Sequence, residues 1–298
     1  MEAKLKELKS RLVEISDLQS AAALLNWDQS TYMPPGGAAA RGRQQATLER
    51  LAHEKLVDPT LGRLIDALEH DIGESEYDSD DAALIRVARR DFDRATRVPS
   101  EFVSEFVGHQ AAAFDAWGRA RPANDFASMA PLLERTLDLS RQYADFFPGY
   151  DHVADPLIAL TDFGMQAAQV RVLFGQLREQ LVPLVQAIAN QSPADDACMH
   201  QFFPEDRQLE AGMAAIKRFG YDLERGRQDK TLHPFCTHFS IGDVRITTRV
   251  DEHDLSNALF STMHECGHAL YEQGIDPALE GTPLARGTSS GVHESQSR

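Results

Sequence analysis

The sequence has few cysteines, few positive charges and no long apolar run. Its 298 residues include three cysteines, and their wide spacing fits reduced thiols in a cytoplasmic protein better than a disulfide framework. Lys and Arg number 30 against 46 Asp and Glu, so the net charge of −16 argues against nucleic acid or an anionic membrane as the main partner. No stretch is apolar over the length that a membrane span needs, and residues 1–8 lack the apolar core of a signal peptide.

Alternation of apolar and polar residues, the pattern typical of β-strands, is confined to one region. Around Gly242-Asp243 it predicts a short hairpin with a glycine-first turn. The apolar members of this pattern are Phe239, Ile241, Val244, Ile246 and Val250. Elsewhere apolar residues recur at helical spacing and prolines separate the segments. Helices are predicted up to about Trp27, from about Ala38, and over 81–97, 100–119, 126–146, 162–189 and 205–219, with a solvated acidic loop between His70 and Asp81. The fold class is therefore mainly α.

The run His264-Glu265-Cys266-Gly267-His268 indicates a metal site on a helix. At roughly 100° per residue the two histidines lie about 40° apart, one turn above the other, so both imidazoles can reach one ion. Glu265 lies beside that face, where the H-E-x-x-H pattern places a general base. Cys266 points away and is expected to be a packed thiol. A cap at Asp254 or Ser256 and an end at Gly274 place both histidines in mid-helix.

A catalytic zinc usually has three protein ligands, and two histidines with one glutamate form a standard set. Glu294, in the downstream cluster His293-Glu294-Ser295, is predicted as the third ligand. The alternative is that the two histidines merely form hydrogen bonds in a polar helix.

Several further segments resemble the M32 family of metallocarboxypeptidases, the thermostable carboxypeptidase Taq type. The resemblance extends from about residue 20 to the last residue. It rests on Trp27-Asp28-Gln29 through Gly37, on His233-Pro234-Phe235 (HPF), on Asp243-Val244-Arg245-Ile246-Thr247 (DxRxT), and on the run from Gly287 through the HES motif to Arg298.

This resemblance implies a fold, a cofactor and a ligand set. The fold would be a helical, two-lobed zincin-type peptidase with a deep groove and a small β-hairpin beside the zinc helix. Residues 1–298 would form one peptidase domain, with a helical part (1–230) and a hairpin and zinc-site part (231–298). His264, His268 and Glu294 would hold Zn²⁺, or another divalent metal such as Co²⁺, with Glu265 as the base. Family members pair as homodimers.

The sequence departs from the family pattern at its end. Family members continue beyond HES to two further signatures, IRxxAD and GxxQDxHW, whereas this sequence stops at Arg298. The family part that it lacks is expected to close the substrate groove and to stabilise the oxyanion, and losing one such donor costs about 10²–10³ in rate. Full activity of this sequence is therefore not expected.

The function expected from these motifs is release of C-terminal amino acids from peptides with broad specificity. An exposed edge of the hairpin could hold an extended peptide by main-chain hydrogen bonds. His233 and His293 are candidate substrate contacts through their motifs, and Arg245 could pair with a peptide carboxylate or be neutralised by Asp243. The alternatives are a zinc oligopeptidase that cuts internally and an inactive zinc-binding helical scaffold.

Overall fold

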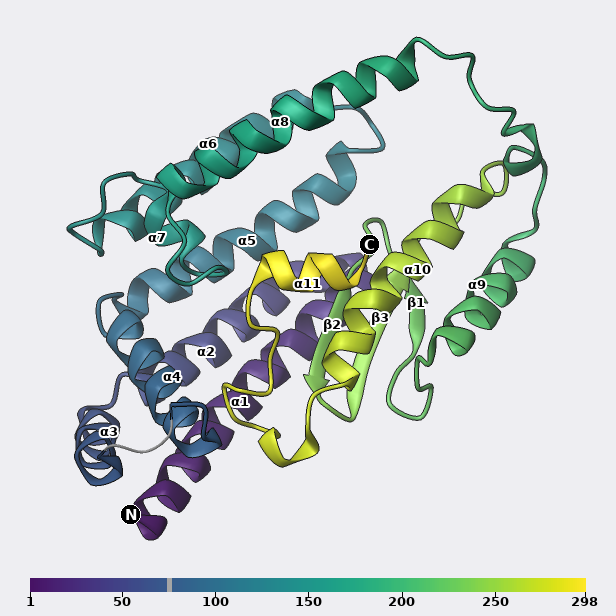
Figure 1. Ribbon diagram of the computed structural model, residues 1–298. Coiled ribbons are helices and arrows are strands. Elements are labelled where there is room, and N and C mark those ends of the chain that lie inside the picture. The colour runs from purple at the N-terminus through teal and green to yellow at the C-terminus, as the bar shows by residue number, and fades with distance from the viewer. Residues whose placement is uncertain (74–76) are drawn as a thin grey trace.

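The protein is built mainly from helices, as the sequence predicts (Figure 1). The computed structural model describes residues 1–73 and 77–298, so the predicted acidic loop between His70 and Asp81 lies partly outside the described residues. The helices are α1 (Glu2–Thr31), α2 (Ala38–Leu56), α3 (Pro59–Ile72), α4 (Asp80–Ala95), α5 (Ser100–Ala120), α6 (Phe126–Asp145), α7 (Asp155–Ile158), α8 (Ala167–Ala189), α9 (Glu205–Phe219), α10 (Leu255–Gln273) and α11 (Ser290–Gln296).

The N-terminal helices share one apolar core. α1 packs on α2 and α3, and α2 packs on α5. The helical spacing of leucines in α1 buries one face of that helix against α3 and α4. The core contains Leu5, Leu8, Leu12, Ile15, Leu61, Ile65, Leu68, Leu84 and Ile85. α1 continues past its predicted end near Trp27 to Thr31, because the chain has no helix-breaking residue before Pro34.

Two helix starts show how local chemistry sets the boundaries. α3 begins at Pro59 because Asp58 caps it, accepting a hydrogen bond from the backbone N–H of Thr60. α8 begins at Ala167 rather than near Asp162, as the sequence pattern predicted. Its start is fixed by a reciprocal cap, in which the side chain of Gln166 accepts from the backbone at Gln169 and that of Gln169 accepts from the backbone at Gln166.

The predicted hairpin is present and belongs to a sheet of three strands. β2 (Cys236–Ser240) pairs antiparallel with β3 (Asp243–Thr248), and β1 (Gln228–Lys230) pairs parallel with the other side of β3. Ser240 pairs with Asp243, so the turn consists of Ile241 and Gly242 and the glycine comes second, one residue away from the predicted position. β1 was not predicted, because its three polar residues show no alternation of apolar and polar side chains. The sheet contains residues from both predicted parts of the domain, 1–230 and 231–298, because β1 pairs with β3.

α10 has the boundaries that its end signals predict. The side chain of Asp254 accepts a hydrogen bond from the backbone N–H of Ser256 at 3.0 Å, and the helix ends at Gly274. One face packs on β3 and another on α9. The shared core contains Ile216, Tyr221, Val244, Ile246, Cys266 and Ala269. Full burial of a side chain such as Ile246 stabilises the fold by roughly 1.5–3 kcal/mol, so this packing holds α10 firmly in place.

Candidate metal centre

Two helices bring together the three residues predicted to bind a metal. On α10 the rings of His264 and His268 lie one turn apart, with centroids 4.9 Å apart and planes at 89°. Glu294 comes from α11, and its carboxylate oxygens lie 3.9 Å from Nε2 of His264 and 3.9 Å from Nε2 of His268. Arg298 approaches the same carboxylate at 3.9 Å. The three potential ligand atoms all lie within 4.8 Å of one another.

This donor set fits a divalent cation. At bonds of about 2.0–2.2 Å and tetrahedral angles two ligand atoms lie roughly 3.3–3.6 Å apart, so the 3.9 Å separations between the histidines and Glu294 need to close by only a few tenths of an ångström around an ion. Burial, with neighbouring His293 and His264, lowers the pKa of His268 below its usual value, so this imidazole is neutral near pH 7. A neutral imidazole is the form that binds metals. Two imidazoles and one carboxylate are also a set that zinc commonly accepts.

Glu265 lies beside this cluster as a buried carboxyl group. Its side chain faces the protein interior and the residue is only 6% exposed. Burial raises its pKa from the usual 4.5 to about 7, with a smaller contribution from the negative charge of Glu294, and a backbone hydrogen bond from Cys236 partly opposes the shift. A carboxyl group with a pKa near 7 can both accept and return a proton near neutral pH.

The raised pKa of Glu265 predicts a pH-dependent stability in the metal-free protein. Because the folded pKa of about 7 exceeds the usual 4.5, the contribution of this carboxyl is fully present below about pH 4.5 and is lost as the pH rises toward 7. Glu265→Gln should therefore gain stability relative to the parent chain between pH 5 and pH 8, by up to about 3 kcal/mol. Urea unfolding of both proteins at pH 5 and at pH 8 measures the difference between their free energies of unfolding. The same difference at both pH values would contradict the prediction.

Gly267 allows α11 to reach α10. A Cβ atom at this position would lie 2.5 Å from Cα of Ser297 and would also meet the backbone carbonyl of Gln296. Real side chains do not tolerate such distances, so the end of α11 packs on α10 where the helix surface lacks a side chain. Gly267 lies between the two histidines in the sequence. Its close contact with the end of α11 therefore holds Glu294 next to them.

Gly267→Ala is expected to lower zinc affinity by about 10-fold or more, as happens when the surroundings of a metal site are disturbed. The added methyl group would displace α11 and carry Glu294 away from the histidines, while alanine itself favours α10. Zinc titration against a competing chelator measures the effect. Gly175→Ala on α8 is the matched control, because a Cβ there would meet nothing within 4 Å. Equal zinc affinity of the two variants would refute this role for Gly267.

A hydrogen-bonded chain continues from His268 away from the ligand cluster. Nδ1 of His268 lies 2.6 Å from Nδ1 of His293, and Nε2 of His293 lies 2.7 Å from Oε1 of Glu272. The other carboxylate oxygen of Glu272 lies 3.5 Å from Nδ1 of His238. Glu272 is buried on α10, one turn beyond His268. A carboxylate behind a ligand histidine fixes the orientation of the ring, here through His293.

Glu272→Gln is expected to weaken zinc binding by about 10–100-fold, because a neutral amide orients His293, and through it His268, less strongly. The competitive zinc titration of the purified variants measures this change. His238→Gln is the comparison, since His238 contacts the same carboxylate without contacting His293, and its effect should be much smaller. If both substitutions weakened binding equally, general disturbance of the cavity would explain the result better than ring orientation.

The other predicted residues lie in different surroundings. His293 is next to the ligand cluster, as described, whereas His233 packs edge-on against Trp117 of α5, with ring centroids 6.3 Å apart. Arg245 forms two hydrogen bonds with Asp243, at 2.8 and 2.7 Å, and lies over the ring of Trp27. Arg245 is thus paired with Asp243 in this structure, and its contact with a peptide carboxylate stays a prediction. Cys266 is a fully buried thiol in the core behind α10, as expected.

Glu272 was not among the predicted site residues, although the sequence contains a signal for it. It lies four residues after His268, so both occupy the same side of α10. An acidic residue one turn beyond an H-E-x-x-H motif is therefore a candidate for orienting a ligand.

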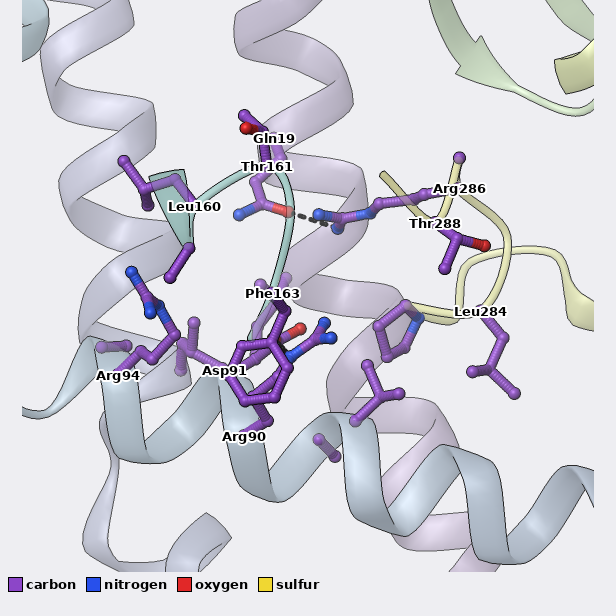
Figure 2. A pocket seen from close by; sticks show the side chains of 18 of the residues that line it. Gln19, Arg90, Asp91, Arg94, Leu160, Thr161, Phe163, Leu284, Arg286 and Thr288 are labelled. Carbon is purple, nitrogen blue, oxygen red and sulfur yellow. Dashed lines mark hydrogen bonds and ion pairs between the residues drawn. The ribbon is translucent and has the colours of Figure 1, made fainter. Parts of the chain in front are cut away.

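Two cavities meet at His293. One, of about 470 Å³, is lined by the β2 residues 236–240, together with Glu272 and Arg286. The other, of about 650 Å³, lies between α4, the loop after α7 and the loop before α11. Figure 2 shows Arg90 and Arg94 on one side of this second cavity and Arg286, hydrogen-bonded to Gln19, on the other. His293 and Arg286 line both cavities, so space for a ligand reaches the neighbourhood of His268.

Comparison with known proteins gives the family. The family model described as Carboxypeptidase Taq (M32) metallopeptidase matches residues 7–298. The chain belongs to the M32 family. It is 34% identical over 293 residues to carboxypeptidase 1 of Bacillus subtilis and 36% identical over 295 residues to thermostable carboxypeptidase 1 of Thermus thermophilus. These alignments cover 98% and 96% of this chain and 58% of each relative.

Solved M32 structures share the fold. The M32 carboxypeptidase of Deinococcus radiodurans superposes with a TM-score of 0.85 at 49% identity, and the carboxypeptidase of Pyrococcus furiosus with a TM-score of 0.84 at 31% identity. Each comparison covers 99% of this chain and 59% of the solved chain. This M32 chain thus spans about three-fifths of the length of the relatives that it matches.

Proposed function

We propose that this chain carries the metal centre of a zinc-dependent metallocarboxypeptidase that releases C-terminal residues from peptides with broad specificity. The observation that supports this most strongly is the convergence of His264, His268 and Glu294 next to a buried Glu265 whose pKa is about 7. Membership of the M32 family supports a divalent metal and carboxypeptidase chemistry. Because the chain spans 58% of its curated relatives, the activity of the whole protein is part of the proposal.

In this proposal the two histidines and Glu294 hold the metal, and Glu265 moves the proton. Zinc, when bound, would polarise the scissile carbonyl and make water more acidic. Glu265 accepts the proton from the attacking water at its carboxylate and returns it to the leaving amine. Burial raises the proton affinity of this carboxylate into the range where both transfers are possible near pH 7. Glu272 and His293 hold the ring of His268 in place.

The position of β2 supports recognition of an extended peptide. β2 is an edge strand, since the order in the sheet is β1-β3-β2, and its residues line the cavity that also contains Glu272 and His293. Main-chain hydrogen bonds to such an edge are independent of peptide sequence, which suits broad specificity. Arg286 lines both cavities near His293, and its guanidinium is a candidate to recognise the terminal carboxylate. His233 and Arg245 stay predicted substrate contacts.

Zinc binding by a helical scaffold without turnover is the second candidate function, because the shared part that carries the metal centre is 58% of the length of the curated relatives. A zinc oligopeptidase is a further alternative. It would differ from a carboxypeptidase in the shape of its substrate groove rather than in its metal ligands.

Peptides are the proposed partners, and a homodimer is the proposed assembly. The net charge of −16 disfavours nucleic acid and anionic membranes. Over the described ranges, no helix has both the length and the apolar character required to cross a bilayer. All three cysteines are free, which supports the proposed cytoplasmic setting.

Incubation of the zinc-loaded chain with unblocked peptides, followed by mass spectrometry, tests this function. The proposal predicts a ladder of single-residue losses from the C-terminus. Internal cuts would favour the oligopeptidase, and intact peptides with zinc still bound would favour the scaffold. Blocking the C-terminus of the same peptides by amidation is the control, because it should stop a carboxypeptidase and spare an oligopeptidase.

A further inference from the structure

A further cavity, of about 590 Å³, adjoins the cavity of about 470 Å³ along β2. It lies between α1, α2 and α5 and is closed by the segment before β2, from which His233 and Phe235 line it. The next residues of the chain, 236–241, line the 470 Å³ cavity. Both cavities are lined by Ala23 of α1 and Glu49 of α2, so space for an extended ligand continues along the edge strand.

Glu49, at the junction of these two cavities, has an unpaired carboxylate. Its side chain is half-buried and forms no hydrogen bond or ion pair with any residue of 1–73 and 77–298. Burial raises the pKa of this carboxyl above its usual value, and the charge of Arg286 partly opposes the shift. The carboxylate has therefore lost water without gaining a partner, and a cation supplied by a ligand would compensate for that loss.

The other two acidic residues that line the 470 Å³ cavity are already engaged. Glu272 is hydrogen-bonded to His293 at 2.7 Å, and Glu280 accepts a hydrogen bond from the backbone N–H of Ile241 at 2.8 Å. Of these three carboxylates, the one of Glu49 is thus available to a ligand.

Gln45 gives a second and independent indication of a ligand. It lies one turn before Glu49 on α2, is only 5% exposed and lines the 590 Å³ cavity. Within the described part of the chain its side-chain amide has no hydrogen-bond partner. Buried amides are nearly always hydrogen-bonded, so this one is available to a molecule inside the cavity. The other polar residues that line this cavity are Asn26, Ser30, Gln110 and His233.

Arg286 and Glu49 place opposite charges at different parts of the 470 Å³ cavity. The guanidinium, hydrogen-bonded to Gln19 at 2.8 Å, lies where this cavity meets the 650 Å³ cavity, whereas Glu49 lies where it meets the 590 Å³ cavity. A peptide with its terminal carboxylate at Arg286 would extend along β2 toward Glu49. A positive group on that peptide would then meet a carboxylate of opposite charge.

We propose that Glu49, together with the amide of Gln45, forms a subsite for a positively charged group of the peptide substrate. This group is the side chain of a Lys or Arg near the C-terminus of the peptide, or the free α-amino group of a short peptide. The carboxylate of Glu49 and Oε1 of Gln45 accept its hydrogen bonds. This inference rests on the proposed function for the nature of the ligand, and it adds a residue that selects among peptides. Peptides without a positive group still bind through β2, but more weakly.

Calorimetric titration with matched peptides tests the subsite. The titrations use the zinc-loaded chain with Glu265→Gln, so that binding is measured without cleavage. N-acetylated tripeptides of alanine contain either Lys or Met at one of the three positions, because Met has a similar length and no charge. At one position or more, Lys should bind about 10-fold more tightly than Met, as expected for a hydrogen bond between charged groups. Glu49→Gln should remove this gain. The Met peptides without the acetyl group show whether the α-amino group is recognised.

Glu54→Gln is the matched control, because Glu54 is an exposed residue of the same helix that pairs with Arg50. It should leave the affinities for all peptides unchanged, and neither substitution should alter zinc affinity. The proposal would be overturned if a positive charge gave no gain at any position, or if the gain survived Glu49→Gln.

Cleavage of the same peptides by the chain with Glu265 intact separates this inference from the proposed function. A gain that depends on Glu49 without any cleavage would support the subsite and reject the turnover. Cleavage without any gain from a positive charge would reject the subsite alone. If no peptide bound at all, both would be rejected.

Discussion

Glu265→Gln is expected to reduce peptide hydrolysis by the zinc-loaded chain by about 10²–10⁴-fold, the usual contribution of a positioned acid–base group. Glutamine has nearly the same shape but cannot accept the proton of the attacking water. Zinc content should be unchanged, since Glu265 is not one of the three residues whose ligand atoms converge. Rates with an unblocked peptide, together with the zinc content of the same samples, measure both quantities.

Glu210→Gln is the matched control for this substitution. Glu210 is an exposed carboxylate on α9, paired with Arg207 on the surface, and its loss should leave both rate and zinc content unaltered. Residual activity of Glu265→Gln close to that of the parent chain would show that another group accepts the proton. Loss of zinc along with activity would instead place Glu265 among the ligands.

Glu294→Ala is expected to weaken zinc binding by more than the roughly 100-fold that a residue behind the ligands can contribute. The substitution removes the one carboxylate among the three converging ligands and leaves two imidazoles, fewer than the three protein ligands that a zinc site usually has. Alanine maintains helix propensity in α11, so the packing of this short helix on Gly267 should persist. Competitive titration with a chromophoric chelator measures the affinity.

Glu224→Ala, on the exposed segment after α9, removes the same negative charge away from the cluster. Its zinc affinity should equal that of the parent chain. If Glu294→Ala also bound zinc like the parent, the third ligand would have to come from elsewhere, and the convergence of α11 on α10 would have another purpose.

Much of the fold could be predicted because its signals are local. Asp254 and Gly274 mark the two ends of α10, and the alternation from Phe239 to Ile246 marks the hairpin. β1 could not be predicted, because its three residues become a strand only through parallel pairing with β3, which is remote in sequence. The start of α8 was misplaced because the reciprocal cap of Gln166 and Gln169 uses residues that are uncommon at helix starts.

The same distinction holds for the metal site: features set by local spacing could be predicted, and features set by contacts between segments remote in the sequence could not. The helical spacing of His264 and His268 specifies that both face one point, and the structure gives that arrangement. The distance from these histidines to Glu294 depends on how α11 packs against Gly267, which no periodicity in the sequence encodes. The link from His293 to Glu272 likewise exists only after α11 has packed on α10.

An anomalous difference map collected at the zinc edge from crystals of the zinc-loaded chain would locate the metal. We expect one strong peak within about 2.0–2.2 Å of Nε2 of His264, Nε2 of His268 and a carboxylate oxygen of Glu294. Glu265 should lie beside that peak without touching it. A peak bound by Cys236 or Cys266, or a peak that is not bound by Glu294, would contradict this assignment of the metal ligands.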